Sequence, residues 1–246
     1  MINLYATLRF NIRAFGLRQG LKFPVYIYGN FKLKNIGKIN IKCPVRRRLI
    51  VIGTNHDFVV APFTLFNNLG TLDIYGKVFI NYGTYIFNKG DIVFHGNNII
   101  GNKSEVRIFS RLEIGYNTIL GFDSHIQDSD MHYLINMDSR QVFRNCAPIV
   151  LGRYNWLGSN CYVKRGTVTP DYLTVASPNT LLSKNYSTLP PHSVLAGCPA
   201  RLVKQGIRRI FNYSQEHIVR SYFAQHPDAT FYQIDETADL DSICTL

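Results

Sequence analysis

The chain has few cysteines and no long apolar runs. These two features limit the cellular compartments in which we expect the protein. Its 246 residues include five cysteines, an odd and widely scattered set without a CxxC pair, which fits unpaired thiols in a reducing compartment. No apolar run is long enough to cross a membrane, and Arg9 and Arg13 interrupt the stretch where a secretory leader needs an apolar core. We therefore expect a cytoplasmic protein.

Charge is also scarce, and it is unevenly distributed. Charged residues make up 17% of the chain and hydrophobic residues 46%, which predicts a folded protein with one sizeable core. Residues 1–48 contain no acid but eleven of the 27 Lys and Arg residues, and the first acid is Asp57. The other 16 basic residues balance the 16 acidic ones, so the net charge of +11 belongs to residues 1–48. Such a segment suits an anionic partner: a membrane surface, an acidic glycan or a nucleic acid.

The start of this basic segment also has a helical pattern. Apolar residues share one face of a predicted helix over residues 4–15, and they are Tyr5, Leu8, Ile12 and Phe15. Arg9 and Arg13 lie off that face. A helix of this design can lie on an anionic membrane, or its apolar face can cap the rest of the fold, and the sequence leaves both alternatives open.

Apolar residues recur every six positions through the middle of the chain. The runs are Ile74, Ile80, Ile86 and Ile92; Ile108, Ile114, Leu120 and Ile126; and Leu151, Leu157, Val163, Thr169, Val175 and Leu181. A period of six fits neither an α-helix nor an antiparallel meander. It fits a short flat strand followed by a tight corner, with three such units forming one triangular coil of about eighteen residues.

The repeats define the expected organisation of the chain. A coil is predicted over residues 49–200, and the period is interrupted at residues 127–148, which we interpret as a protruding loop of the kind that often carries function. Residues 201–246 are predicted to form helices and an acidic tail. The expected fold class is all-β, a parallel β-helix of hexapeptide repeats with short flanking helices that cap the coil. The period alone does not set the handedness.

Three short motifs stand out beside the repeats: residues 155–160 read NWLGSN, residues 196–201 read AGCPAR, and residues 128–132 read DSDMH. They resemble motifs of the hexapeptide-repeat acyltransferases, in particular the branch that O-acetylates sugars and polysaccharides, in which the last has the form D-[TS]-D-x-H. The resemblance covers residues 49–205. It implies a left-handed coil, a homotrimer, and transfer of an acetyl group from acetyl-CoA to a sugar hydroxyl of a surface glycan or its precursor. It implies no metal.

The resemblance also implies a general base. A hydroxyl becomes a useful nucleophile when a base takes its proton, and histidine titrates near neutral pH. The matched motif assigns that base to His132, with Asp130 or Asp128 orienting its imidazole. His125, one residue before the inward-pointing Ile126, is the alternative base. No serine or cysteine nucleophile stands out, so direct attack through a tetrahedral intermediate is simpler than an acyl-enzyme.

The donor site is implied by the same match. Trp156, the only tryptophan, would pack on the pantetheine arm of coenzyme A, and the turn at Ser159 would supply N–H groups to the oxyanion. The phosphates of coenzyme A need cations, and the matching positions are Lys184, Arg201 and Lys204. Pro178 departs from the family pattern, which favours a small residue or Asn there.

Other functions remain as alternatives. The acceptor could instead be a small xenobiotic or an amino sugar, or the coil could be a non-catalytic module that binds glycan or membrane. A zinc-dependent carbonic anhydrase of this fold is disfavoured because the spacing of His95, His125 and His132 does not match that family. A sugar nucleotidyltransferase is disfavoured because no Gly-rich phosphate loop precedes the coil. No nucleic-acid partner is expected.

Overall fold

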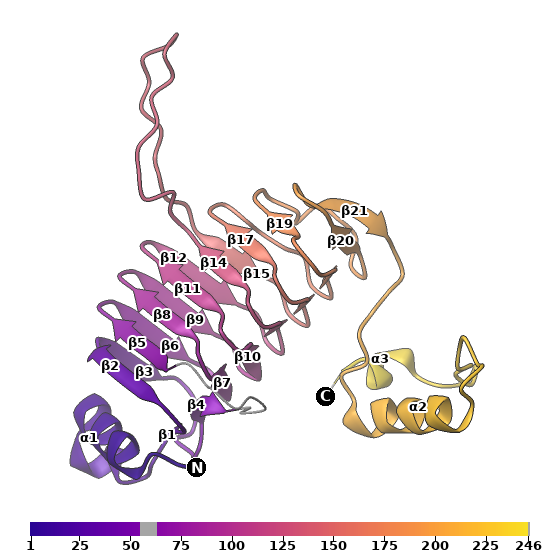
Figure 1. Ribbon diagram of the computed structural model, residues 1–246, viewed down its shortest axis with the longest axis horizontal. Coiled ribbons are helices and arrows are strands. Elements are labelled where there is room, and N and C mark those ends of the chain that lie inside the picture. The colour runs from indigo at the N-terminus through magenta and orange to yellow at the C-terminus, as the bar shows by residue number, and fades with distance from the viewer. Residues whose placement is uncertain (55–62, 246) are drawn as a thin grey trace. The chain divides into compact units, whose positions relative to one another are not determined.

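The structure, a computed structural model, describes residues 1–54 and 63–245, and its coil is the left-handed parallel β-helix that was expected (Figure 1). Among the described residues, three sheets form the sides of the coil. Sheet 1 contains β1 (Val25–Ile27), β4 (Ile50–Thr54), β7 (Val78–Asn81), β10 (Asn98–Ile100), β13 (Ile119–Leu120), β16 (Trp156–Leu157), β18 (Thr174–Val175), β20 (Val194–Ala196) and β21 (Arg201–Lys204). Sheet 2 contains β2 (Phe31–Asn35), β5 (Thr64–Asn68), β8 (Tyr85–Asn88), β11 (Glu105–Ile108), β14 (His125–Gln127), β17 (Tyr162–Lys164) and β19 (Leu181–Leu182). Sheet 3 contains β3 (Lys38–Ile41), β6 (Thr71–Ile74), β9 (Asp91–Phe94), β12 (Arg111–Ile114) and β15 (Ile149–Leu151).

The residues of the six-residue repeat form the core, with one exception. Ile80, Ile114 and Val163 show the pattern, since each is at most 2% exposed. The exception is Leu181, which is only partly buried, whereas Leu182 is fully buried in its place. The prediction for Leu181 was wrong because the turn before β19 contains one residue more than the repeat.

The coils are longer than eighteen residues in the N-terminal half. Thr71 pairs with Asp91 and Asp91 with Arg111, which is a step of 20 residues, whereas Trp156 pairs with Thr174, a step of 18. The difference arises because β6, β9 and β12 each have four residues and bury two or three side chains, whereas β16 and β18 have two residues each. The eighteen-residue coil therefore holds only where the strands are short.

The coil also begins earlier than residue 49. The strands β1, β2 and β3 pair in parallel with β4, β5 and β6, so they form the first coil, and the expected boundary was wrong. The six-residue period is hard to see in this segment because lysines occupy exposed positions of β2, where Lys32 and Lys34 lie.

Helix α1 (Leu4–Gly20) covers the open end of this first coil. Phe10 is buried and its ring lies 6.2 Å from that of Phe31 and 5.4 Å from that of Phe66. The edge strand β1 receives side-chain hydrogen bonds: Asn11 Nδ2 donates to Val25 O at 2.7 Å, and Asn11 Oδ1 accepts from Val25 N at 3.0 Å. The helix thereby protects an unpaired strand edge.

Only part of the predicted apolar face of α1 covers the coil: Phe15 packs against the core, whereas the first turns of that face point outward. Tyr5 is 73% exposed and Leu8 is 47% exposed, and Leu4 beside them is also exposed. The structure therefore makes the helix a cap through Phe10 and its polar neighbours, and leaves an apolar outer face flanked by Arg9 and Arg13.

The C-terminal residues form a second compact unit that starts at Ile207. The expected boundary at 201 was wrong because β21 still pairs with β20, in antiparallel orientation. Within the second unit, α2 (Tyr213–Gln225) and α3 (Leu240–Ile243) are each capped by an Asn or Asp side chain, and Phe211 and Ile243 are buried. Among the described residues, no helix is long and apolar enough to cross a membrane.

The loop expected at residues 127–148 leaves the coil between β14 and β15 as a long hairpin (Figure 1). We call residues 128–148 the arm. Antiparallel bridges join Ser129 to Cys146 and Ile135 to Val142. The large apolar side chains of the arm are exposed, and they are Met131, Tyr133, Leu134, Ile135, Met137, Val142 and Phe143. Such a bare apolar surface is typical of a segment that packs against another molecule.

Candidate active site

Trp156 and Ser159 line one groove on the outer side of the coil. The groove has a volume of about 390 Å³ and follows the ends of β16 and β18 in sheet 1. Its lining residues are Gly121, Trp156, Gly158, Ser159, Thr174, Val175, Ala176 and Ser177. We call it the Trp156 groove. Small side chains form its floor and the partly exposed indole of Trp156 forms one wall, which suits a slender ligand.

Two of the three predicted cations lie on the same face of sheet 1 as this groove. In successive strands Trp156 pairs with Thr174, Thr174 with Val194, and Val194 with Lys204. Paired residues project to the same side of a sheet, so Lys204 lies in the row of Trp156, three strand spacings or about 14 Å along the coil. Arg201 pairs with Ala196, two residues beyond Val194 in β20. A ligand that starts at Trp156 and runs along this face reaches both cations.

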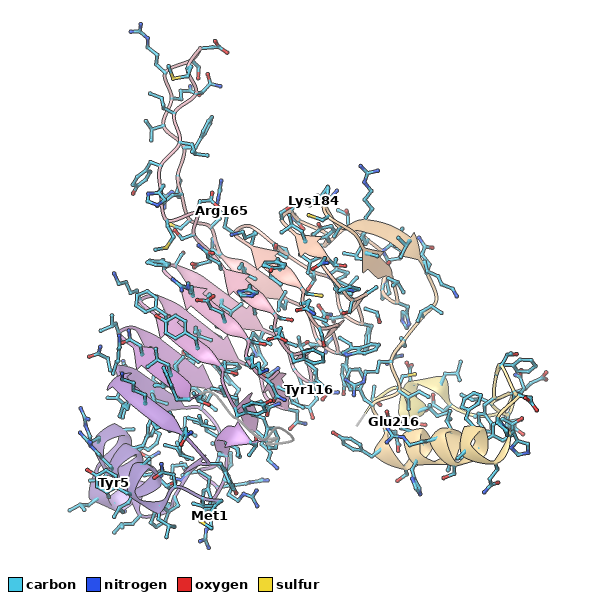
Figure 2. The ribbon with its side chains drawn as sticks, in the orientation of Figure 1. Met1, Tyr5, Tyr116, Arg165, Lys184 and Glu216 are labelled. Atoms are coloured by element: carbon cyan, nitrogen blue, oxygen red, sulfur yellow. The ribbon has the colours of Figure 1, made fainter. Side chains whose placement is uncertain are left out.

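Lys184 lies elsewhere. It follows β19 in sheet 2, and its ammonium lies over the ring of Tyr186, 5.5 Å from the ring centre. Figure 2 shows Lys184 on the edge of the coil that also carries Arg165, near the base of the arm. Lys184 therefore lies outside the row of sheet 1 that carries Arg201 and Lys204.

The turn after β16 presents a backbone donor to the groove. Among the described residues, no protein acceptor takes the N–H of Ser159, whereas the Ser159 carbonyl accepts from Ser177 Oγ at 2.6 Å. Cys161 lies directly behind, fully buried, with its Sγ 3.8 Å from the carbonyls of Ser159 and Ala176. Burial raises the pKa of the Cys161 thiol to about 11, so the thiol is neutral near pH 7 and is not a nucleophile.

The predicted base, His132, is exposed on the arm. Within the described part of the chain no side chain forms a hydrogen bond with its imidazole. Asp130, its expected orienting partner, instead forms an ion pair with Arg165, which follows β17. The carboxylate of Asp130 is thus held at the base of the arm.

Asp128 has a structural role. It is fully buried, and its carboxylate accepts from the backbone N–H groups of Phe109, Ser110 and Arg111 at 2.8, 2.7 and 2.9 Å. Burial raises the pKa of Asp128, and these donors act in the opposite direction. Both carboxylate oxygens are committed to the coil below, so Asp128 anchors the arm and does not orient His132 in the same chain.

His125 faces outward from β14, as expected. Its Nδ1 lies 3.2 Å from Glu105 Oε2, and its ring stacks on Tyr162 with the ring centres 4.9 Å apart. His95 belongs to another side of the coil, beside Glu113, and that hydrogen bond lowers the pKa of Glu113. In the described residues, no three His, Cys, Asp or Glu side chains are grouped as metal ligands.

Two residues of this region were not predicted from the sequence. Arg165 lies 35 positions after Asp130, and no motif connects them, so only the fold shows that they meet. Ser177 lines the Trp156 groove, and its one sequence signal was its neighbour Pro178, which departs from the family pattern.

Comparisons with known proteins give matches among solved structures. No protein-family model and no curated protein sequence matches the chain. The polysialic-acid-specific acetyltransferase NeuO aligns with a TM-score of 0.45 at 19% identity, over 81% of this chain and 94% of that one. The polysialic acid O-acetyltransferase OatWY aligns with a TM-score of 0.41 at 18% identity, over 77% and 89%. AntD, an N-acyltransferase from Bacillus cereus in complex with dTDP and 3-hydroxybutyryl-CoA, aligns with a TM-score of 0.44 at 13% identity, over 83% and 89%.

These identities are low, and the features of the chain itself carry the assignment of the fold. Its short parallel strands stack in three sheets, and its repeat residues fill the core between them. The NWLGSN motif contains strand β16 of sheet 1, and the AGCPAR motif joins β20 to β21 at the C-terminal end of the same sheet. The chain therefore has the left-handed hexapeptide-repeat β-helix fold.

Proposed function

We propose that this protein is an acyl-CoA-dependent O-acyltransferase that transfers an acetyl group to a sugar hydroxyl of a surface glycan or its precursor in the cytoplasm. One observation carries the proposal: the Trp156 groove and the cations Arg201 and Lys204 share one face of sheet 1. The apolar wall and small floor suit a pantetheine arm, and the cations suit the phosphates at the other end of coenzyme A.

The catalytic base comes from a second copy of the chain. The arm leaves the coil after β14 of sheet 2, whereas the Trp156 groove follows β16 of sheet 1. His132 and the groove therefore belong to different corners of one coil. The exposed apolar side chains of the arm become buried when the arm packs against a neighbouring copy. In a closed ring of three copies of the chain, each Trp156 groove receives the arm of one neighbouring copy.

The chemistry then needs no covalent intermediate. His132 removes the proton of the acceptor hydroxyl as its oxygen attacks the thioester carbonyl. The Ser159 N–H stabilises the resulting oxyanion. When the tetrahedral intermediate collapses, the carbon–sulfur bond breaks, and the imidazolium returns its proton to the departing thiolate of coenzyme A. The products are the acetyl ester and coenzyme A.

Calorimetry and a thiol-release assay test the proposal. Purified protein should bind coenzyme A, sediment as a trimer, and release thiol from acetyl-CoA only when a glycan acceptor is added. If thiol is released with an amino sugar or a small xenobiotic but not with any glycan, the acceptor belongs to that other class. A protein that does not bind coenzyme A at all is a non-catalytic binding module, and the proposal then fails.

A further inference from the structure

A second pocket lies on the coil, away from the Trp156 groove, and its charge is strongly positive. It has a volume of about 610 Å³. Its lining residues are Cys43, Pro44, Arg46, Arg47, Arg48, Leu49, Tyr75, Gly76, Lys77, Phe79, Asn97 and Tyr116. We call it the arginine pocket. Figure 2 shows Tyr116 on a different edge of the coil from Arg165 and Lys184, so this pocket is separate from the base of the arm.

Three of the four cations that line the arginine pocket, Arg47, Arg48 and Lys77, lie against aromatic rings. Arg47 donates a hydrogen bond to the Tyr26 hydroxyl, and the guanidinium groups of Arg47 and Arg48 lie 5.5 and 5.7 Å from the centre of the Tyr26 ring. The ammonium of Lys77 lies 4.8 Å from the centre of the Phe79 ring. Within residues 1–54 and 63–245, no acidic side chain forms an ion pair with these cations. Their positive charge is therefore available to a ligand.

The other lining residues suit a sugar. Tyr75 is 46% exposed, and the hydroxyl of the partly exposed Tyr116 accepts a hydrogen bond of 2.7 Å from Asn97 Nδ2. Aromatic rings offer flat apolar surfaces for pyranose rings, while amide and hydroxyl groups can bond sugar hydroxyls. Arginine side chains bind carboxylates through paired hydrogen bonds, which compact ammonium groups cannot form.

An outward row of sheet 1 connects the two sites. Phe79 of the arginine pocket pairs with Ile99, Ile99 with Ile119, and Ile119 with Trp156. The row therefore crosses three strand spacings, about 14 Å, and ends at the Trp156 groove. Its members between the two sites are partly exposed isoleucines. A polymer bound in the arginine pocket can lie along this face with another of its sugars near the Trp156 groove.

We infer that the arginine pocket binds carboxylate-bearing sugars of an acidic glycan, at a position remote from the transfer site. The inference rests on the proposed function for the role of that glycan as acceptor. Binding itself depends only on the pocket. The site holds one part of the polymer while another part presents its hydroxyl, so affinity should increase with the length and acidity of the glycan.

The test measures binding of polygalacturonate to the full-length protein by calorimetry, with neutral dextran and polyglutamate as comparison polymers. Arg46→Gln/Arg48→Gln should weaken polygalacturonate binding by about 10- to 100-fold, because each arginine contributes charge-assisted hydrogen bonds. Arg9→Gln/Arg13→Gln removes the same charge from exposed positions of α1 and should change affinity less than twofold. Melting temperature checks the fold of each variant, and Lys77→Gln tests the same pocket if the double variant fails to fold.

Several outcomes overturn the inference. The first is that Arg46→Gln/Arg48→Gln and Lys77→Gln bind polygalacturonate as tightly as the wild type. The second is that Arg9→Gln/Arg13→Gln loses as much affinity as the pocket variant, because the polymer would then respond to the overall positive charge and not to this pocket. Polyglutamate binding as tightly as polygalacturonate would show that charge alone is recognised. Anionic phosphatidylglycerol vesicles that bind through Arg46 and Arg48, where polygalacturonate does not, would make the pocket a lipid site. Coenzyme A affinity, measured on the same samples, tests the proposed function separately.

Discussion

Trp156→Ala should weaken coenzyme A binding by an amount that the structure limits. Trp156 is 39% exposed, which leaves at most about 100 Å² of its surface for a ligand to cover. At about 25 cal/mol per Å², full coverage contributes about 2.5 kcal/mol, or about 70-fold in Kd. A slender pantetheine arm that covers half of this surface contributes about 8-fold. We therefore expect a loss between these limits, with little effect on the coil because the side chain lies outside the core.

Calorimetry measures that loss, and fluorescence provides a second readout. Trp156 is the only tryptophan, so coenzyme A should change the emission of the wild-type protein directly. Phe63→Ala is the matched control, because Phe63 is an aromatic residue that is 54% exposed just before β5, away from the groove. Equal affinity in wild type and Trp156→Ala, together with unchanged emission, would refute the assignment of the donor to this groove.

Three further predictions concern the base, the cap and the outer face of α1. His132→Ala should lower kcat by about 10² to 10⁴ with coenzyme A affinity near normal, and full activity in that variant would refute the assignment. Asn11→Ala leaves the buried Val25 N–H and carbonyl without partners and should cost about 2 to 6 kcal/mol of unfolding free energy in urea; a loss below about 0.5 kcal/mol would contradict the cap. Leu4→Ser/Leu8→Ser should reduce sedimentation with anionic liposomes at low salt, and equal sedimentation of wild type and variant would exclude a membrane role for this face.

The predicted catalytic residues show what a short sequence motif can predict about a site and what it cannot. The D-x-D-x-H pattern selected His132, Asp130 and Asp128 as one group, because residues within five positions are close along the chain. The fold separates them: Asp128 bonds backbone N–H groups of the preceding coil, and Asp130 meets Arg165. His132 extends away on the arm. Its role as the base is a prediction, which the His132→Ala variant tests.

The sequence by itself determined the architecture of the coil, because the side-chain period reports directly which residues point inward. The six-residue spacing identified buried residues such as Ile86 and Leu157, and the interruption after Ile126 located the arm. It failed where a turn gained one residue, as at Leu181, and where lysines on exposed positions hid the first coil. A short repeat encodes neither the length of each turn nor the identity of the exposed residues.

Only the tertiary structure decided which distant residues share a surface. Strand pairing aligns Trp156 with Lys204, 48 positions later, and the same row extends back to Phe79. The arginine pocket joins Arg46 to Tyr116 in the same way. The physical reason is that each coil places residues about twenty positions apart at one strand spacing, so register, and not proximity along the chain, determines the neighbours on each face.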